Sequence, residues 1–176
     1  WKAPAGVALN SDFTVKVRLQ DGVWHTLSSY LIKVDEVRDT RHYVENASMA
    51  IFDFTGKVEV AVTYNLGEVQ TAKVRPLSYD IPFQIDGNTV TFTLEHPRNL
   101  SVEVNGDIFH NLHLFTGSPE RTIPDKDNPE VIYFGPGIHT VKNGELRVPS
   151  GKTVYLAGGA VLMGRVLIEN VHDVKL

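Results

Sequence analysis

Two short apolar segments near the C-terminus recur at a fixed interval. Leu146-Arg147-Val148 returns twenty residues later as Val166-Leu167-Ile168, and Val154-Tyr155-Leu156 returns as Val174-Lys175-Leu176. A period of about 20 residues that carries two short strands is typical of a solenoid, in which successive coils stack on one another. Such arrays need about three or more repeats and a polar cap for stability. We therefore expect the chain to be the N-terminal part of a longer protein.

The composition is that of an ordinary globular protein and excludes several partners. The 176 residues carry a formal charge of -4, from 17 basic and 21 acidic residues, so no basic surface for nucleic acid is expected. No segment approaches the roughly 18 apolar residues of a membrane helix, and no membrane association is expected. The absence of cysteine excludes disulfides and thiolate metal sites. No cofactor is predicted.

Alternating apolar and polar residues predict strands in the first hundred residues. The turns Asp86-Gly87-Asn88 and Asn105-Gly106 carry the residues that tight hairpins require. Strands about ten residues apart with turns between them predict an antiparallel β-sandwich. A weak apolar stripe predicts one helix, at residues 35–46. The predicted strands cover residues 15–19, 58–62, 90–94 and 100–104.

The character of the chain changes after residue 118. Residues 117–130 gather three prolines with serine, aspartate and asparagine, which is typical of a linker. Beyond it, residues 131–134 and 160–163 are apolar at every position, so both faces of these strands must be covered. We predict an all-β protein with a β-sandwich domain at residues 1–118, a linker at 119–130 and the first, incomplete coils of a right-handed parallel β-helix at 131–176.

Three segments of the second half resemble the entry into the right-handed parallel β-helix of polysaccharide-degrading glycoside hydrolases. They are residues 105–115 (NGDIFHNLHLF), residues 133–139 (YFGPGIH) and residues 154–161 (VYLAGGAV). The polygalacturonase-like and the dextranase and isopullulanase-like enzymes are the nearest groups. In the dextranase and isopullulanase group an N-terminal β-sandwich leads into the β-helix, the same order that is read here from the strand patterns.

The resemblance implies a secreted or periplasmic hydrolase that acts on a polysaccharide or oligosaccharide by inversion. Aspartates on later coils would serve as general acid and base, about 6.5–9.5 Å apart. Those coils lie beyond residue 176, so no catalytic residue is assigned and the chain alone is expected to be inactive. The sandwich would cap the β-helix and help to shape the substrate groove, and the remainder of the β-helix would be its partner.

Two alternatives to the hydrolase interpretation remain open. The chain would alternatively be a non-catalytic carbohydrate-binding module, or the N-terminal part of a polysaccharide lyase built on the same helix. Phe109, Phe115, Tyr133 and Phe134 are candidates for the junction between sandwich and coils.

Trp24 is the one candidate for carbohydrate binding, because it lies beside the Asp21-Gly22 turn, where an exposed indole can stack on a sugar ring. No metal site is predicted. His110 and His113 are three residues apart on a strand and should point to opposite faces. The acidic loop with Asp125 and Asp127 lacks the spacing of a calcium site and is interpreted as solvated linker.

Overall fold

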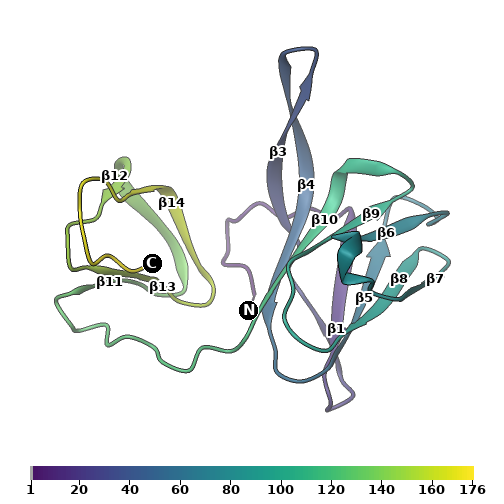
Figure 1. Ribbon diagram of the computed structural model, residues 1–176, viewed down its shortest axis with the longest axis horizontal. Helices are drawn as coiled ribbons and strands as arrows, with labels where there is room; N and C mark the ends of the chain where they lie inside the picture. Colours follow the sequence, from purple (N-terminus) through teal and green to yellow (C-terminus); the bar gives the residue numbers. More distant parts are fainter. Residues whose placement is uncertain (1) are drawn as a thin grey trace. The chain divides into compact units, whose positions relative to one another are not determined.

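A computed structural model describes residues 2–176 of the chain (Figure 1). The protein is all-β, as predicted, and the described residues form fourteen strands and one short 3-10 helix, η1 (Leu77–Tyr79). η1 lies between Pro76 and Pro82, two residues that cannot donate to a sheet. None of the described residues forms a helix with the length and hydrophobicity that a bilayer crossing needs.

Residues 8–119 form two five-stranded sheets. The first has the order β2-β1-β5-β8-β7, and every pair in it is antiparallel. Its strands are β1 (Phe13–Arg18), β2 (Trp24–Thr26), β5 (Val58–Tyr64), β7 (Phe83–Asp86) and β8 (Thr89–Leu94).

The second sheet has the order β3-β4-β10-β9-β6 and contains one parallel pair, between β4 and β10. Apolar residues at alternate positions of its central strands, such as Leu100, Val102 and Val104 of β9, belong to the core, so one face of the sheet packs on the core and the other is the outer face. Its strands are β3 (Tyr30–Arg38), β4 (Arg41–Asp53), β6 (Ala72–Arg75), β9 (Leu100–Val104) and β10 (Asp107–Gly117).

The inner faces of the two sheets share one apolar core. It is made mainly of valine, leucine and phenylalanine at alternate positions, as in Val58, Val60 and Val62 of β5. Leu112 and Leu114 of β10 contribute from the opposite sheet. Burying each such side chain stabilises the fold by about 1.5–3 kcal/mol, which makes this core the main source of stability of the sandwich.

The strand predictions are confirmed, but the helix predicted at residues 35–46 is wrong. These residues form the hairpin of β3 and β4, which extends past the other strands of its sheet (Figure 1). The two-residue turn is Asp39-Thr40, and both residues have positive φ, 46° and 70°. The valines of this segment favour a strand over a helix. The predicted turn at Asn105-Gly106 is confirmed, with φ values of 54° and 79°.

Residues 120–176 form two pairs of parallel strands, and we call the segments that hold β11 with β12 and β13 with β14 the first and the second coil. β11 (Val131–Phe134) pairs in parallel with β13 (Thr153–Leu156), and β12 (Gly137–Arg147) pairs in parallel with β14 (Ala160–Leu167). Each strand of the first coil therefore lies beside the corresponding strand of the second. Tyr133 of the first coil pairs with Tyr155 of the second, and their ring centroids lie 5.2 Å apart.

The twenty-residue repeat is confirmed for one of its two segments. Leu146 pairs with Val166 and Arg147 with Leu167, as the repeat requires. The second segment is displaced, because Thr153 pairs with Lys175 rather than with Asp173. The turn that precedes it is longer in the second copy and contains two residues with positive φ, Asn170 and Asp173.

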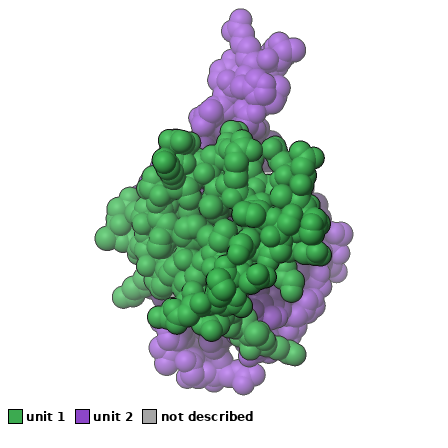
Figure 2. Space-filling model, turned by 90° about the vertical axis from the view of Figure 1, so that its left-hand side faces the viewer, with its two compact units in different colours: residues 1–7, 120–176 green, residues 8–119 purple. Residues whose placement is uncertain are grey.

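The chain divides into two compact units, shown in different colours in Figure 2. One holds residues 8–119, so it ends where the predicted linker begins. The other holds residues 120–176 together with the N-terminal residues 2–7, which the sequence had grouped with the sandwich. The reason is local packing: Gly6 lies against Ile138, and the Lys2 carbonyl lies beside Gly159.

Candidate functional site

The outer face of the second sheet carries a cleft of about 500 Å³. That volume lies within the range of about 300–1,000 Å³ that ligand pockets occupy. Strand register explains which side chains meet there, because Arg75 of β6 pairs with Ser101 of β9, and Ser101 pairs with His113 of β10. The lining residues are Arg75, Pro76, Leu77, Asn99, Leu100, Ser101, His113 and Phe115.

Two aromatic rings form one side of the cleft. The rings of His113 and Phe115 lie 6.4 Å apart between centroids, with an angle of 12° between their planes. Phe115 is 38% exposed. Burial lowers the pKa of His113, so its imidazole is uncharged at neutral pH. The two stacked rings therefore offer an uncharged aromatic surface, which we call the platform.

The guanidinium of Arg75, the one charged side chain that lines the cleft, is held in place by a buried carboxylate. Arg75 donates from Nε to Oε1 of Glu103, which is only 5% exposed. Oε2 of Glu103 is also buried and has no hydrogen-bond partner among the described residues. Among residues 2–176, Arg75 is the one ion-pair partner of Glu103. The terminal nitrogens of Arg75 have no partner among residues 2–176 and are available to a ligand.

Two further polar groups of the cleft retain unused hydrogen-bonding capacity. The Ser101 hydroxyl accepts from Asn111 Nδ2 at 3.0 Å, and its own proton has no acceptor within the described part of the chain. The side-chain amide of Asn99 makes no hydrogen bond there. The cleft therefore combines donors and acceptors with an apolar platform and carries no uncompensated charge.

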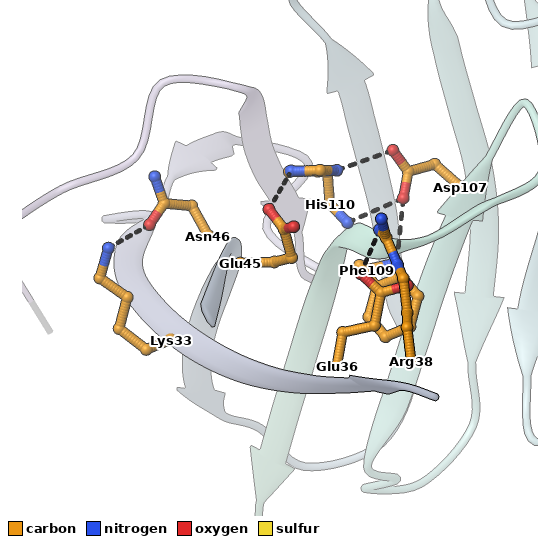
Figure 3. Close-up of polar contacts among 8 residues, drawn as sticks. All are labelled: Lys33, Glu36, Arg38, Glu45, Asn46, Asp107, Phe109 and His110. Atoms are coloured by element: carbon orange, nitrogen blue, oxygen red, sulfur yellow. Dashed lines mark hydrogen bonds and ion pairs between the residues drawn. The ribbon is translucent and has the colours of Figure 1, made fainter. Parts of the chain in front are cut away.

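A second polar cluster lies on the same sheet, around His110 (Figure 3). The imidazole bridges two carboxylates, with Nδ1 at 2.9 Å from Asp107 Oδ2 and Nε2 at 3.2 Å from Glu45 Oε2. Oδ1 of Asp107 accepts from the backbone N–H groups of Phe109 and His110 at 2.9 and 3.0 Å. The cluster ties the bulged start of β10 to the adjacent strand β4.

The ion pairs of this cluster shift the pKa values of its members. The hydrogen bond to Asp107 raises the pKa of His110, against the effect of burial, and the Glu45 carboxylate adds to the rise. Burial alone would raise the pKa of Asp107, but hydrogen bonds from His110 and Phe109 lower it overall. The cluster contains no nucleophile, and the described residues hold no group of acidic and histidine side chains suited to a metal ion. We interpret it as a structural clamp.

Trp24, the predicted sugar-binding residue, lies on the short edge strand β2 and is 38% exposed. The guanidinium of Arg18 lies 4.7 Å from the centroid of its indole ring, and Arg18 also pairs with Glu59. This contact orients the indole. Sugar binding by Trp24 remains a prediction, and the residue belongs to the sheet opposite the cleft.

The other residues that the sequence singled out lie apart from one another. His113 lines the cleft, whereas His110 belongs to the carboxylate clamp. Asp125 accepts from the backbone of Asp127 at 3.0 Å, which is a local turn interaction. Sequence reasoning missed Arg75, because the alternation in β6 extends over only four residues and is too short to stand out. The alternation in β9 predicts that Ser101 and Glu103 point away from the core. It does not predict which residues of other strands lie beside them.

Residues 120–176 contain few carboxylates, and the least exposed of them, Glu145, is paired with two arginines. Glu145 accepts a hydrogen bond from Arg165 at 2.6 Å and forms an ion pair with Arg147 at 2.6 Å. The hydrogen bond from Arg165 is the main cause of its lowered pKa, so Glu145 remains ionised and is unsuited to act as a general acid. Tyr155 donates to Glu120, and this hydrogen bond raises the pKa of Tyr155 to about 12.

No protein-family model matches the sequence, and neither does any curated protein. Among solved structures the chain is similar to Dex49A from Penicillium minioluteum, with a TM-score of 0.61 and 16% sequence identity. The similarity covers 93% of this chain and 44% of Dex49A, so the chain spans less than half the length of that protein. At this identity the comparison establishes a shared fold, which extends over nearly the whole of the present chain.

Proposed function

We propose that the chain is the N-terminal region of a polysaccharide-degrading glycoside hydrolase. The observation that carries the proposal is the fold shared with Dex49A, a dextranase, over 93% of the chain. The sequence resemblance of residues 105–115, 133–139 and 154–161 supports the same group of enzymes. The chain would act outside the cell or in the periplasm, where polysaccharides are degraded.

In this proposal β11 to β14 are the first turns of a right-handed parallel β-helix. The parallel pairing of β11 with β13 and of β12 with β14, with Tyr133 beside Tyr155, supports it. The catalytic aspartates would lie on coils encoded after residue 176, and hydrolysis would proceed by inversion. The engagement of Glu145 by two arginines agrees with a non-catalytic role for the present coils. The sandwich would cap the helix and contribute to the substrate groove.

The test is to express the entire product of the gene and to supply dextran, pullulan and polygalacturonate. We expect release of reducing sugar from at least one of them, with inversion of the anomeric configuration in the first product seen by NMR. The 176-residue chain alone should release none. Failure of the entire product to cleave any glycan would contradict the proposal, and an unsaturated product that absorbs in the ultraviolet would identify a lyase.

A second candidate function is a non-catalytic carbohydrate-binding module. The observation that favours it is the cleft on the outer face of the second sheet, which needs no residue from the coils. Binding of a glycan by the 176-residue chain, combined with a gene that encodes no further coils, would favour this candidate over the hydrolase.

A further inference from the structure

The cleft on the outer face of the second sheet has the chemistry of a binding site that is independent of hydrolysis. Its lining is contributed by β6, β9, β10 and the segment around η1, all within residues 8–119. A ligand here must match an aromatic platform on one side and unused hydrogen-bonding groups on the other. The three groups are Arg75, Asn99 and Ser101.

The platform selects for a flat, weakly polar ligand face. The rings of His113 and Phe115 are stacked with nearly parallel planes, and Phe115 is 38% exposed, so part of this aromatic surface is open to a ligand. The face of an aromatic ring is electron-rich and attracts the polarised C–H bonds of a partner. One face of a pyranose ring consists of such C–H bonds. A pyranose can therefore lie on this platform while its hydroxyls extend to the rim.

The polar rim of the cleft, formed by Arg75, Asn99 and Ser101, favours ligand groups that both donate and accept hydrogen bonds. The terminal nitrogens of Arg75 only donate, whereas the Asn99 amide and the Ser101 hydroxyl can do both. Hydroxyl groups satisfy such a mixture. A phosphate or carboxylate accepts only and would leave the acceptor groups of Asn99 and Ser101 unused.

The charge balance further distinguishes a neutral from an acidic sugar. Arg75 is the only lining residue with a permanent charge, and that charge is already balanced by Glu103. Glu103 has no other partner within the described chain, so a uronate carboxylate would compete with a buried charge for the same cation. Competition of this kind disfavours an acidic ligand.

We propose that the outer-face cleft binds a neutral sugar unit of a polysaccharide, which stacks on His113 and Phe115 and is hydrogen-bonded by Arg75, Asn99 and Ser101. The inference deepens the proposed function, since it takes the polysaccharide substrate as the ligand. It assigns the sandwich a substrate-holding role that does not depend on where the catalytic residues lie.

The test is affinity electrophoresis of the 176-residue chain in gels that contain dextran, pullulan or polygalacturonate, followed by calorimetric titration. We expect retardation by at least one neutral glucan and none by polygalacturonate. Phe115→Ala should weaken binding by about tenfold or more, and Phe115→Trp should preserve it. The matched control is Phe83→Ala on the opposite sheet, where the ring is 37% exposed, and this variant should bind normally.

A second variant tests the polar rim without exposing the fold to an unbalanced charge. Arg75→Lys keeps the charge beside Glu103 but removes the two terminal nitrogens, so it should also weaken binding by about tenfold. Thermal unfolding of each variant checks that the sandwich is intact. Trp24→Ala, assayed in parallel, determines whether any binding arises at β2 instead of the cleft.

Several results would overturn the inference. They are binding that survives Phe115→Ala and Arg75→Lys undiminished, binding to polygalacturonate alone, and no binding to either neutral glucan. If the entire gene product hydrolyses a glucan that the 176-residue chain does not bind, the cleft is not a sugar site although the proposed function stands. If the cleft binds a glucan but the entire gene product hydrolyses none, the cleft is a sugar site and the proposed hydrolase function is wrong.

Discussion

Leu112 is central to the stability of the sandwich, because its side chain has no exposed surface. Leu112→Ala removes buried atoms and leaves a cavity, so it should lower the free energy of unfolding by about 2–5 kcal/mol. Urea denaturation monitored by circular dichroism measures the change. Ile108→Ala, in the same strand at an exposed position, is the control and should change stability by no more than about 0.5 kcal/mol. Equal effects of the two variants would contradict the described core.

His110 makes a pH-dependent contribution to stability. Its pKa is raised in the folded protein, mainly by Asp107, so its contribution is complete below the ordinary histidine pKa of about 6.5 and is lost as pH rises through the raised value. In the uncharged ring only one nitrogen carries a proton, so one of the two carboxylates loses its donor. The effect should be about 0.5 kcal/mol, as for other exposed ion pairs.

The measurement is the free energy of unfolding in urea at a series of pH values, together with the NMR titration of the His110 ring. His110→Gln should remove the decline above neutral pH. A His110 resonance that titrates below about 6.5, or a variant with the same pH profile as the parent chain, would exclude the clamp.

At the scale of single elements, the β3–β4 hairpin shows where local sequence and conformation disagree. Thr40 is β-branched, yet it occupies the left-handed region at a φ of 70°. Thr40→Gly should relieve this strain and raise the free energy of unfolding by about 0.5–1 kcal/mol. Thr91→Gly, in the middle of strand β8, should lower it by a similar amount. Calorimetric melting of both variants checks the opposite signs.

Gly164 is required by the geometry of the second coil. Residues 141–144 of β12 stand opposite Gly164 alone, and a Cβ there would lie 2.3 Å from Val141 Cγ2 and 2.9 Å from the Gly144 carbonyl oxygen. Gly164→Ala should therefore lower stability by about 1–3 kcal/mol and increase amide exchange in β12 and β14. Gly137→Ala provides the control, because its φ of 125° is also unusual but a Cβ there meets nothing within 4 Å. A larger effect at Gly137 would contradict this account.

How far the sequence predicts these elements depends on how much of the signal is local. Alternation in β1, β5, β8 and β9 and the Asn105-Gly106 turn depend on neighbouring residues, and all are observed. The turn of the β3–β4 hairpin, Asp39-Thr40, contains no glycine that would signal a hairpin. Without that signal, the spacing of the apolar residues predicts a helix instead. The cleft requires β6, β9 and β10 to pair side by side, and pairing of distant strands leaves no mark on any one of them.

At the scale of the whole molecule, the two compact units have separate apolar interiors. All members of the sandwich core lie within residues 8–119, whereas Val154 is buried within the coils. Val154→Ala should therefore speed amide exchange in β11 to β14 and leave the sandwich protected, and Leu112→Ala should have the reverse effect. Hydrogen exchange read by mass spectrometry resolves the two regions. Uniform acceleration by either variant would show that the units unfold together.

The packing of residues 2–7 with the coils imposes an order on biosynthesis. Gly6 leaves the ribosome before Ile138, against which it rests, because Ile138 is translated more than a hundred residues later. At about 5–20 residues per second the leading segment waits for roughly ten seconds, while the intervening sandwich has time to form. Residues 2–7 therefore join a unit whose other members are translated after the sandwich, and a bulky insertion just before residue 2 would interfere with a part of the chain more than a hundred residues away.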